Sequence, residues 1–376
     1  MTMISYIIWN GSPEIFSFGS FALRWYGLLF ALGFLISQQL LYYMYRKEGK
    51  PERDVETLTI YMVVATIIGA RLGHVIFYQP EMFLNDPLGI FLPFQFSPTF
   101  KFTGLQGLAS HGGAFGILFA LWLYSRKKKP GQSYLQILDR IVILVALTGC
   151  LIRLGNFFNS EIIGKPTDSP TGVVFTGRVT EAIMRNQNNL VETIGITKDE
   201  QSEVDSNGQT PIQIYLFFKK GVSREAAENY VRTDVKYILS HLNEFINESP
   251  LVAINYEIVS EKEGAWVTKV HTIGIVRHPA QLYESISCII LFAFLFWYWH
   301  RYQLNTPPGR IFGLFLVILW TLRFAYEYLK ENQEAFEGNL PINMGQILSV
   351  PLILAGIYVL VRSYQKPSNK QTLSGN

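Results

Sequence analysis

Seven long apolar stretches, separated by polar segments, constrain this chain more than any other feature of its sequence. Each is close to the length of about 20 residues that an α-helix needs to cross a bilayer. Inside a bilayer only helices and closed barrels satisfy their own backbone hydrogen bonds. The predicted spans are Phe21–Tyr45, Thr57–Phe77, Gly107–Tyr124, Leu138–Phe157, Ala280–Trp299, Arg310–Tyr328 and Met344–Val361. We therefore predict an all-α polytopic membrane protein with seven transmembrane helices.

The composition agrees with a membrane protein and excludes several other classes. Charged residues make up 16% of the 376 residues, whereas soluble domains carry about 25%. The net charge of +3 and the absence of a basic stripe argue against a nucleic-acid partner. Cys150 and Cys288 lie inside apolar runs, which is typical of buried thiols rather than of a disulfide or a metal pair. No metal-spacing cluster or glycine-rich nucleotide motif is present, so we expect no metal and no cofactor.

The distribution of basic residues predicts the orientation of the chain. Cytoplasmic loops carry an excess of Lys and Arg. Basic residues follow the first, third, fifth and seventh predicted spans, as in the run Arg126–Lys129. The N-terminus is therefore predicted outside and the C-terminus in the cytoplasm. The segment before Phe21 lacks the basic start and apolar core of a signal peptide, so the first span is expected to stay as an anchor.

A long polar segment interrupts the second half of the chain. We predict a small α+β extracytoplasmic insert at residues 177–272, between spans one to four (1–176) and spans five to seven (273–365), with a cytoplasmic tail at 366–376. Within the insert, Pro211–Phe218 alternates like a strand, and Leu251–Val259 and Ala265–Ile275 have strand composition. Ser223–Phe245 has helical spacing with Ser223 as N-cap, and Thr193–Gln209 is expected to be a flexible tether.

Polar residues at the outer end of the fourth span indicate a binding site. Arg153, Asn156, Asn159 and Glu161 follow an apolar run directly and precede Gly164. Ionisable groups at membrane depth are costly unless partnered, and they commonly mark sites. An arginine among neutral hydrogen-bonding side chains suits a phosphate better than a metal, so a lipid headgroup is the expected ligand. The alternative is an arginine that snorkels from a helix end to the interface.

The predicted topology brings further polar groups to the same outer level. His111-Gly112-Gly113 opens the third span, and three roles stay open for His111: an interfacial residue, a proton acceptor, or a hydrogen-bond partner of a phosphate or ester. Arg323 and Glu327, spaced i and i+4 on the sixth span, form either a simple ion pair or an oriented phosphate ligand. Tyr26 at the start of the first span is either an aromatic-belt residue or a hydroxyl donor.

The entry to the fifth span carries the last motif. Arg277-His278-Pro279-Ala280-Gln281-Leu282-Tyr283-Glu284 places a proline where it suits the first turn of a helix. The polar side chains of the octet would then lie in the first turns, near the outer interface. An ordinary polar helix entry is the alternative, and it is the favoured interpretation for Tyr283 alone.

Together these motifs resemble the prolipoprotein diacylglyceryl transferase family. The family signature G-R-x-G-N-F-x-N-x-E-x-x-G matches from Arg153 to Gly164, apart from its leading glycine, where Leu151-Ile152 stands. The family's H-G-G, R-H-P-x-Q-L-Y-E and R-x-x-x-E motifs match at His111, Arg277 and Arg323, and its early tyrosine matches Tyr26. The segment between Phe175 and Arg277 is longer than the family's short head segment, which leaves its part in substrate docking open.

The resemblance implies a seven-span enzyme of the bacterial cytoplasmic (inner) membrane with its active site toward the outer, periplasmic face. It implies transfer of the sn-1,2-diacylglyceryl group of phosphatidylglycerol to the lipobox cysteine of a prolipoprotein signal peptide, with release of sn-glycerol 1-phosphate. No cofactor or metal is implied, and the expected partners are these two substrates and membrane lipids. We expect a monomer.

The resemblance also implies roles for the site residues. His111, Arg153 and Arg323 are the catalytic candidates, with His111 as one candidate base and Arg323 or a relay through Glu327 as competitors. The residues expected to hold phosphatidylglycerol are Arg153, Asn156, Tyr26, Glu161, Gly164, Arg323 and Glu327. Supporting residues are Gly112, Gly113, Asn159, Arg277, Gln281, Tyr283 and Glu284, with Glu161 and Glu284 orienting arginines.

Two other functions compete with the transferase. A polytopic lipid transporter or flippase would use the same polar cavity, but such proteins commonly have internal repeats or broken helices near mid-membrane, and this sequence shows no repeat. A sensor or scaffold built on the outer insert would depend on residues 177–272 and not on Arg153.

Overall fold

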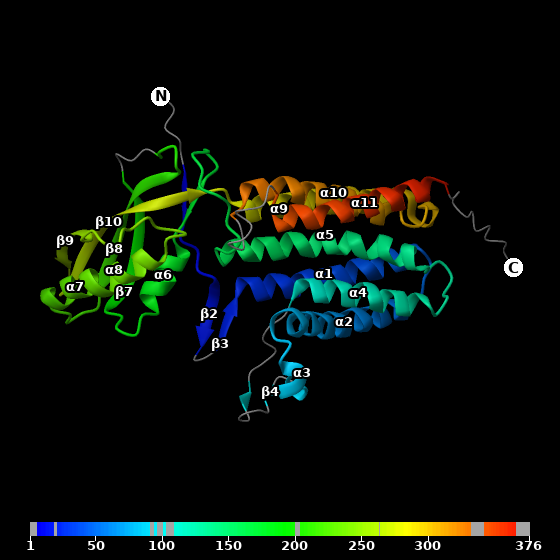
Figure 1. The fold of residues 1–376 in the computed structure, drawn as a ribbon, viewed down its shortest axis with the longest axis horizontal. Coiled ribbons are helices and arrows are strands. Elements are labelled where there is room, and N and C mark those ends of the chain that lie inside the picture. The colour runs from blue at the N-terminus through cyan, green and yellow to red at the C-terminus, as the bar shows by residue number, and fades with distance from the viewer. Residues whose placement is uncertain are drawn as a thin grey trace. The chain divides into compact units, whose positions relative to one another are not determined.

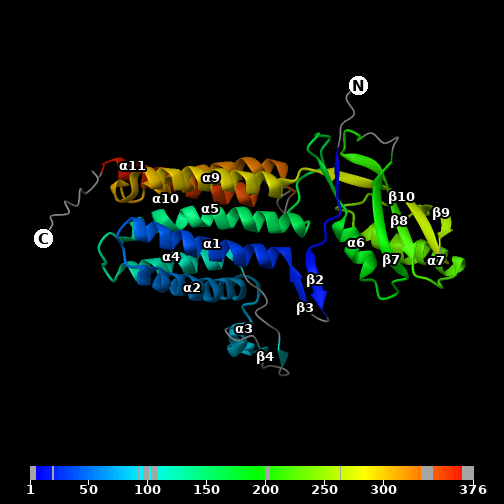
Figure 2. The same ribbon diagram turned by 180° about the vertical axis from the view of Figure 1, so that it is seen from behind.

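The computed structural model describes residues 6–18, 21–90, 94–95, 101–102, 109–199, 204–262, 264–331 and 342–365. The chain forms two compact units. Unit 1 comprises Met1–Gly33, Thr148–Ile289 and Trp320–Val350, and unit 2 comprises Phe34–Leu147, Ile290–Leu319 and Pro351–Asn376. Five long helices each have residues in both units (Figure 1, Figure 2): α1 (Trp25–Lys47), α5 (Tyr134–Phe158), α9 (Ala280–Tyr302), α10 (Arg310–Tyr326) and α11 (Met344–Gln365).

Among the described residues, six helices are long and apolar enough to cross a membrane. They are the five helices above and α2 (Glu52–Tyr78), with α9 and α10 extended by the 3-10 turns η3 (Gln303–Asn305) and η4 (Glu327–Leu329). The third predicted span corresponds to α4 (Ser110–Ser125), whose 16 residues fall short of the usual length of a span; residues 107–108 lie outside the described part. Membrane helices are thus confirmed, while the count of seven is not.

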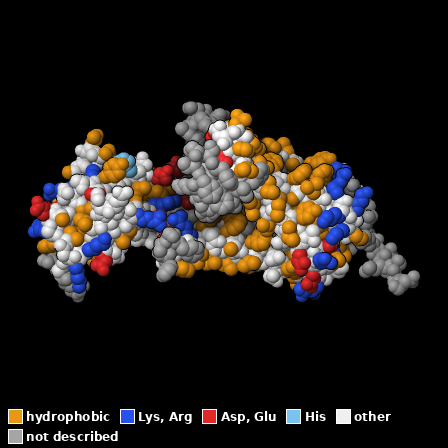
Figure 3. Space-filling view, turned by 90° about the horizontal axis from the view of Figure 1, so that it is seen from below, with side chains coloured by type: hydrophobic (Ala, Val, Ile, Leu, Met, Phe, Trp, Pro, Cys, Tyr) orange, Lys and Arg blue, Asp and Glu red, His pale blue; other side chains and the backbone are white. Residues whose placement is uncertain are grey.

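Hydrophobic side chains cover the outside of the helices in the face that Figure 3 shows. On α2 and α4, for example, Ile60, Phe115 and Phe119 are 62%, 73% and 59% exposed. Apolar surface of this extent is unfavourable in water, and it is what a helix presents to lipid. The exposed side chains therefore agree with the membrane class that the apolar stretches predict.

Unit 1 also contains a six-stranded sheet, so the fold is not all-α outside the predicted insert. The strand order is β1-β6-β10-β8-β7, with β9 also paired to β10; β1 and β6 are parallel and the other pairs are antiparallel. The strands are β1 (Ile7–Trp9), β6 (Val173–Phe175), β7 (Val191–Lys198), β8 (Gln209–Phe218), β9 (Asn255–Lys262) and β10 (Ala265–Arg277). β1 and β6 lie outside residues 177–272, and β10 runs past that range into the Arg277 octet.

The structure agrees with part of the predicted strand pattern and corrects the rest. β8 has the alternation expected of a strand with one buried face, since Ile212, Ile214, Leu216 and Phe218 are buried. The predicted tether Thr193–Gln209 is wrong for residues 193–198, because this part of β7 pairs with β8; residues 200–203 lie outside the described part. Glu192, Gly195 and Lys198 of β7 are poor strand formers alone, and pairing with β8 overrides that preference.

Helices cover the buried face of this sheet. The predicted helix Ser223–Phe245 is shorter and divided into α7 (Arg224–Tyr230), the π-helical turn η2 (Val231–Val235) and α8 (Lys236–His241). Ser223 is the N-cap, as predicted, and its hydroxyl accepts from the Ala226 N–H. These segments and α6 (Gly177–Met184) bury Val179, Ile183, Val231 and Leu239 with the strands in one hydrophobic core.

Aromatic side chains join the end of α5 to the sheet inside unit 1. The rings of Trp9 on β1 and Phe157 on α5 have centroids 4.4 Å apart, and Phe157 lies 5.7 Å from Phe175 on β6. Trp25 stacks on Phe158 at 4.8 Å. Such pairs add stability beyond the area they bury. The last turn of α5, which carries part of the predicted signature, is therefore held by the sheet strands on one side and by Trp25 on the other.

The remaining elements are short. Unit 1 has the hairpin β2–β3 (Glu14–Phe18 and Phe21–Arg24). Unit 2 has α3 (Met82–Asn85), η1 (Leu88–Ile90) and the strand pair β4–β5 (Phe94–Gln95 and Lys101–Phe102). The predicted tail 366–376 lies outside the described residues.

A buried charge cluster, which the sequence interpretation missed, holds helices of unit 2 together. Glu48 Oε1 accepts from Arg140 Nε at 3.0 Å, from Arg140 Nη2 at 2.7 Å and from the Trp299 indole N–H at 2.7 Å. Lys50 Nζ donates to the other carboxylate oxygen of Glu48, Oε2, at 2.6 Å. The Glu48 and Arg140 side chains are 0% and 2% exposed, so the pair depends on being fully hydrogen-bonded.

Replacing Glu48 by alanine is expected to destabilise the protein by about 3–5 kcal/mol, because the buried Arg140 guanidinium loses the carboxylate that accepts two of its hydrogen bonds. The matched control is Glu52→Ala, since Glu52 is 53% exposed and pairs with the exposed Arg46, a pair worth less than about 1 kcal/mol. Unfolding of both variants in detergent measures the difference. Equal stability of the two variants would contradict the structural role of the cluster.

Candidate functional site

Five charged side chains of unit 1 form a continuous line that we call the charge chain. Arg153 on α5 pairs through Nε with Glu284 on α9, and the other Glu284 oxygen pairs with Lys330, directly after η4. Lys330 Nζ lies 3.3 Å from Oε1 of Glu327, and Arg323 Nε on α10 lies 3.7 Å from that oxygen. The order is thus Arg153, Glu284, Lys330, Glu327, Arg323. Residues from three predicted motifs, including Arg153 and Arg323, meet in it.

Burial differs along the charge chain in a way that suits an anion site. The side chains of Lys330, Glu327 and Glu284 are 3%, 5% and 9% exposed, whereas those of Arg153 and Arg323 are 21% and 34% exposed. The buried members therefore fix the geometry, and the arginines at the two ends are the members open to a ligand. Three cations against two carboxylates leave an excess of one positive charge, which favours a bound monoanion.

The predicted signature residues extend the charge chain from Arg153. Arg153 Nη1 donates to the Asn156 side-chain oxygen at 3.4 Å, and the Asn156 amide donates to Glu161 at 3.5 Å. The Asn159 amide donates to the other Glu161 oxygen at 3.4 Å. Glu161 is therefore linked to Arg153 through Asn156, and its ion pair is with Arg178 on α6 at 3.2 Å. Glu284, not Glu161, is the carboxylate that orients Arg153.

The turn between Ser160 and Gly164 has a strained backbone. Ser160 and Ile162 have φ angles of 51° and 57°, and a β-branched residue in this left-handed region is a conformational outlier. Strain of this kind persists where surrounding contacts hold it, often at functional sites. We call residues 160–164 the signature turn.

The Arg277 octet supplies the contacts that hold the signature turn. The buried Arg277 guanidinium donates to the Gly164 carbonyl at 3.0 Å and to the Glu244 carbonyl at 2.6 Å, and it pairs with Glu331 at 2.6 Å. The Gln281 amide, also buried, donates to the Glu161 carbonyl. The octet thus has two functions: Arg277 and Gln281 fix the backbone of the turn, and Glu284 fixes Arg153.

Two glycines of the signature are required by close packing. A Cβ on Gly164 would lie 2.6 Å from the His278 carbonyl oxygen and 2.8 Å from that of Leu329. A Cβ on Gly155 would lie 3.0 Å from Cα of Tyr26, so this glycine lets the start of α1 approach α5. Close packing therefore explains why position 164 is a glycine, and this explanation does not require the predicted contact of Gly164 with lipid.

The predicted supporting residue Tyr283 lies beside the signature turn. Its hydroxyl lies 3.0 Å from the Thr171 hydroxyl and 3.3 Å from His278 Nδ1. Burial lowers the pKa of His278, and Asp168 opposes this shift. The imidazole is therefore neutral at pH 7, and it adds no further positive charge next to the turn.

Sequence reasoning missed three residues that contact Glu327. Lys330 occupies the centre of the charge chain; a lysine three residues after Glu327 at a helix end was a usable signal. Asn343 donates to Glu327 Oε2 at 3.3 Å from the start of α11. Gly345 lies so close that a Cβ would be 2.5 Å from the Glu327 Cδ, which lets the positive end of α11 approach that carboxylate.

His111, Gly112 and Gly113 lie in unit 2, with His111 exposed at the start of α4, whereas the other predicted site residues lie in unit 1. The place of His111 in the site stays a prediction. The glycine after it has a structural explanation: a Cβ on Gly112 would lie 2.2 Å from the Gly69 carbonyl oxygen and 2.8 Å from Gly73 Cα on α2. The backbones of α2 and α4 thus meet at glycines, as is typical of membrane helix pairs.

Replacing Gly112 by alanine is expected to destabilise the protein by about 1–3 kcal/mol, because the new methyl group forces α2 and α4 apart. Gly113→Ala is the matched control, since its nearest neighbour, Ala70 Cβ, would lie at an ordinary 3.6 Å. Thermal unfolding in detergent compares the two variants. If Gly113→Ala destabilises the protein as much as Gly112→Ala, helix packing does not explain the motif.

Among the described residues, six helices are long and apolar enough to cross a membrane, which defines a polytopic membrane protein. Its charge chain ends in two arginines whose side chains are partly exposed. The sequence pattern of the prolipoprotein diacylglyceryl transferase family matches residues 13–362. The chain belongs to this family, and it is a transferase.

Individual relatives match along almost their whole length. Three are named phosphatidylglycerol–prolipoprotein diacylglyceryl transferase. The Bacteroides fragilis protein is 32% identical over 366 residues, covering 97% of this chain and 98% of that protein. The Tolumonas auensis protein is 32% identical over 357 residues, covering 95% and 97%. The Chloroherpeton thalassium protein is 30% identical over 372 residues, covering 99% and 100%.

Proposed function

We propose that this chain transfers the sn-1,2-diacylglyceryl group of phosphatidylglycerol to the thiol of the lipobox cysteine of prolipoproteins. The products are a thioether-linked lipid and sn-glycerol 1-phosphate, and the step is the first in the maturation of bacterial lipoproteins. The observation that carries the proposal is the charge chain, which holds two arginines through three buried charged groups. The names of the relatives support the choice of substrates.

The reaction requires stabilisation of a phosphate leaving group. The cysteine sulfur forms a bond to the glycerol carbon of the diacylglyceryl group, and the bond from that carbon to the phosphate oxygen breaks. Negative charge then grows on the departing phosphate. Arg153 and Arg323 hold and neutralise it, and Asn156 and the Tyr26 hydroxyl donate to phosphate or ester oxygens. Preorganised donors of this kind are commonly the largest contribution to catalysis.

The nucleophile comes from the substrate, so the enzyme needs no cysteine of its own. A thiolate is the reactive form, and a base removes the thiol proton. His111 is our candidate for this base, because an imidazole is the side chain that most often serves as a general base. Arg323 and a relay through Glu327 are the competing candidates.

The proposed setting is the bacterial cytoplasmic membrane. We propose seven spans, with α4 as the third, an N-terminus outside and a C-terminal tail at 366–376 in the cytoplasm. In this arrangement the ends of α5 and α10 that carry Arg153 and Arg323 lie at the outer face, together with residues 177–272. We propose that the protein acts as a monomer.

The test uses the purified protein in phosphatidylglycerol vesicles with a synthetic lipobox peptide. The expected result is a peptide that gains the mass of diacylglycerol, with release of an equal amount of glycerol phosphate. A peptide with serine in place of the cysteine is the control and is expected to stay unmodified. Movement of intact lipid between leaflets without a covalent product would overturn the proposal and favour a transporter.

A further inference from the structure

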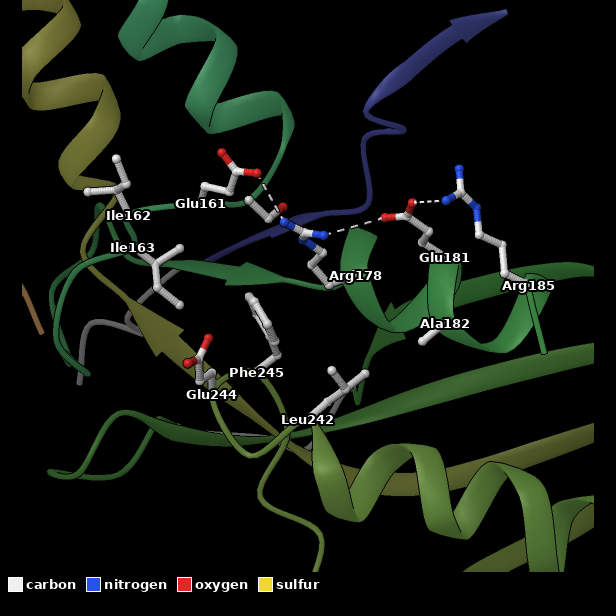
Figure 4. Close-up of a pocket in the computed structure, with 11 residues that line it drawn as sticks. Glu161, Ile162, Ile163, Arg178, Glu181, Ala182, Arg185, Leu242, Glu244 and Phe245 are labelled. Atoms are coloured by element: carbon white, nitrogen blue, oxygen red, sulfur yellow. Dashed lines mark hydrogen bonds and ion pairs between the residues drawn. The ribbon is translucent and has the colours of Figure 1, made fainter. Parts of the chain in front are cut away.

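A cleft of unit 1 borders the signature turn, and the reaction chemistry described above does not use it. Its volume is about 490 Å³, and residues of the signature turn, α6 and the segment 242–245 line it. Figure 4 shows the charged residues along one side: Glu161, Arg178, Glu181 and Arg185. Ile163, Leu242 and Phe245 lie across from them. The cleft therefore combines a charged wall with an apolar wall.

The charged wall is an ion-pair ladder. Arg178 lies 3.2 Å from Glu161 and 3.9 Å from Glu181, and Arg185 lies 3.0 Å from Glu181. Arg185 also pairs with Glu14 on β2. With Glu244 on the opposite side, three glutamates face two arginines, so the lining has an excess of one negative charge. This balance disfavours a phosphate and suits a neutral or basic ligand.

The cleft continues toward the charge chain. A second cleft of about 420 Å³ shares Ile162, Ile163 and Glu244 with the first and reaches Arg277 and Lys330. Ile162, with its left-handed backbone and a 37% exposed side chain, stands where the two clefts meet. An extended ligand that crosses Ile162 therefore runs from the ion-pair ladder to the central lysine of the charge chain.

We infer that the first cleft binds the polypeptide segment that follows the acceptor cysteine of the substrate. The inference rests on the proposed function and adds a specificity site to it. The signal peptide before the cysteine is apolar and belongs in the membrane. In the proposed orientation, the chain after the cysteine emerges at the outer face, where unit 1 carries its sheet. An extended segment with neutral or basic side chains fits one apolar wall and one wall with excess negative charge.

The experiment compares two lipobox peptides as acceptors in phosphatidylglycerol vesicles. One ends at the cysteine, and the other continues for six residues beyond it. Ala182→Trp fills the cleft from α6, and Ala226→Trp on exposed α7 is the matched control. We expect Ala182→Trp to raise the KM of the extended peptide about tenfold. The KM of the peptide that ends at the cysteine is expected to stay unchanged. Ala226→Trp is expected to change neither KM.

A charge test gives a second readout. Glu244→Lys turns the excess negative charge of the cleft into a positive one, and Glu225→Lys on α7 makes the same change on an exposed surface outside it. Two acceptor peptides are compared, one with three Lys residues after the cysteine and one with three Asp residues there. The wild-type protein is expected to prefer the Lys peptide. Glu244→Lys is expected to reverse this preference, and Glu225→Lys is expected to keep it.

The outcomes separate this inference from the proposed function. If the wild-type protein modifies neither peptide, the transferase proposal fails. If it modifies both, but Ala182→Trp raises both KM values equally, the cleft does not bind the segment after the cysteine. A photocrosslinker at position 182 that labels phosphatidylglycerol instead of the extended peptide would assign the cleft to lipid and overturn the inference.

Discussion

Replacing Arg153 by alanine is expected to lower kcat/KM for lipid transfer by about 100- to 1,000-fold, the usual loss when one donor to a developing anion is removed. Arg153 lies at an open end of the charge chain and is oriented by Glu284 and Asn156. Arg153→Lys keeps the charge but loses the planar fork that pairs with both partners. The lysine variant is therefore expected to be at most about tenfold more active than the alanine variant.

The measurement is incorporation of diacylglycerol into a lipobox peptide by protein whose membrane insertion is verified. Arg224→Ala is the control, because Arg224 is an exposed arginine on α7 that pairs with Glu228; it is expected to retain wild-type activity. A correctly inserted Arg153→Ala protein that works at the wild-type rate would show that the two-arginine assignment is wrong.

Replacing Lys330 by methionine is expected to affect both stability and activity. The substitution leaves Glu284 and Glu327 buried without their shared cation, which is expected to cost about 3–5 kcal/mol of stability. Because the same two carboxylates orient Arg153 and Arg323, we also expect kcat/KM to fall about 100-fold. Lys330 is a positioning residue in this account, acting through the two arginines.

Two further variants separate positioning from simple loss of stability. Adding Glu327→Gln to Lys330→Met removes one of the two carboxylates that have lost Lys330 and is expected to recover stability without recovering activity. A double-mutant cycle between Arg153→Lys and Lys330→Met is expected to show coupling above about 0.5 kcal/mol in transition-state energy, because both residues share Glu284. Two results together would contradict a positioning role for Lys330: additive effects in the cycle, and a stable Lys330→Met protein with wild-type activity.

The apolar stretches predicted most of the helices correctly, since α1, α2, α5, α9, α10 and α11 all contain the predicted spans apart from a few end residues. Residues 110–124 of the third predicted span are helical in α4, but the 16 residues of α4 fall short of the usual length of a span. α4 meets α2 at glycines, and these interrupt the apolar pattern of this span. β1, β6 and β7 were missed, because three-residue strands and a strand with a central glycine have weak local patterns and are formed by their neighbours in the sheet.

The sequence predicted which residues lie close together in the charge chain better than it predicted which of them form ion pairs. Spacing along one helix paired Arg323 with Glu327 correctly. It did not assign the central role to Lys330, because an isolated lysine at a helix end has many ordinary explanations. It also allowed Glu161 to orient Arg153, whereas Glu161 pairs with Arg178 from α6. Contacts between elements that are distant in sequence depend on packing, which local patterns do not encode.

The sequence by itself determined that this chain enters a membrane and which polar residues are exceptional there, because burying an ionisable group in lipid is costly enough to stand out without a structure. It also determined the family, through motifs that are rare in combination. Only the tertiary structure decided how those residues act together. Whether a buried glutamate holds an arginine, a lysine or both depends on distances of a few ångströms between separate helices, and these distances are fixed by the packing of the whole unit.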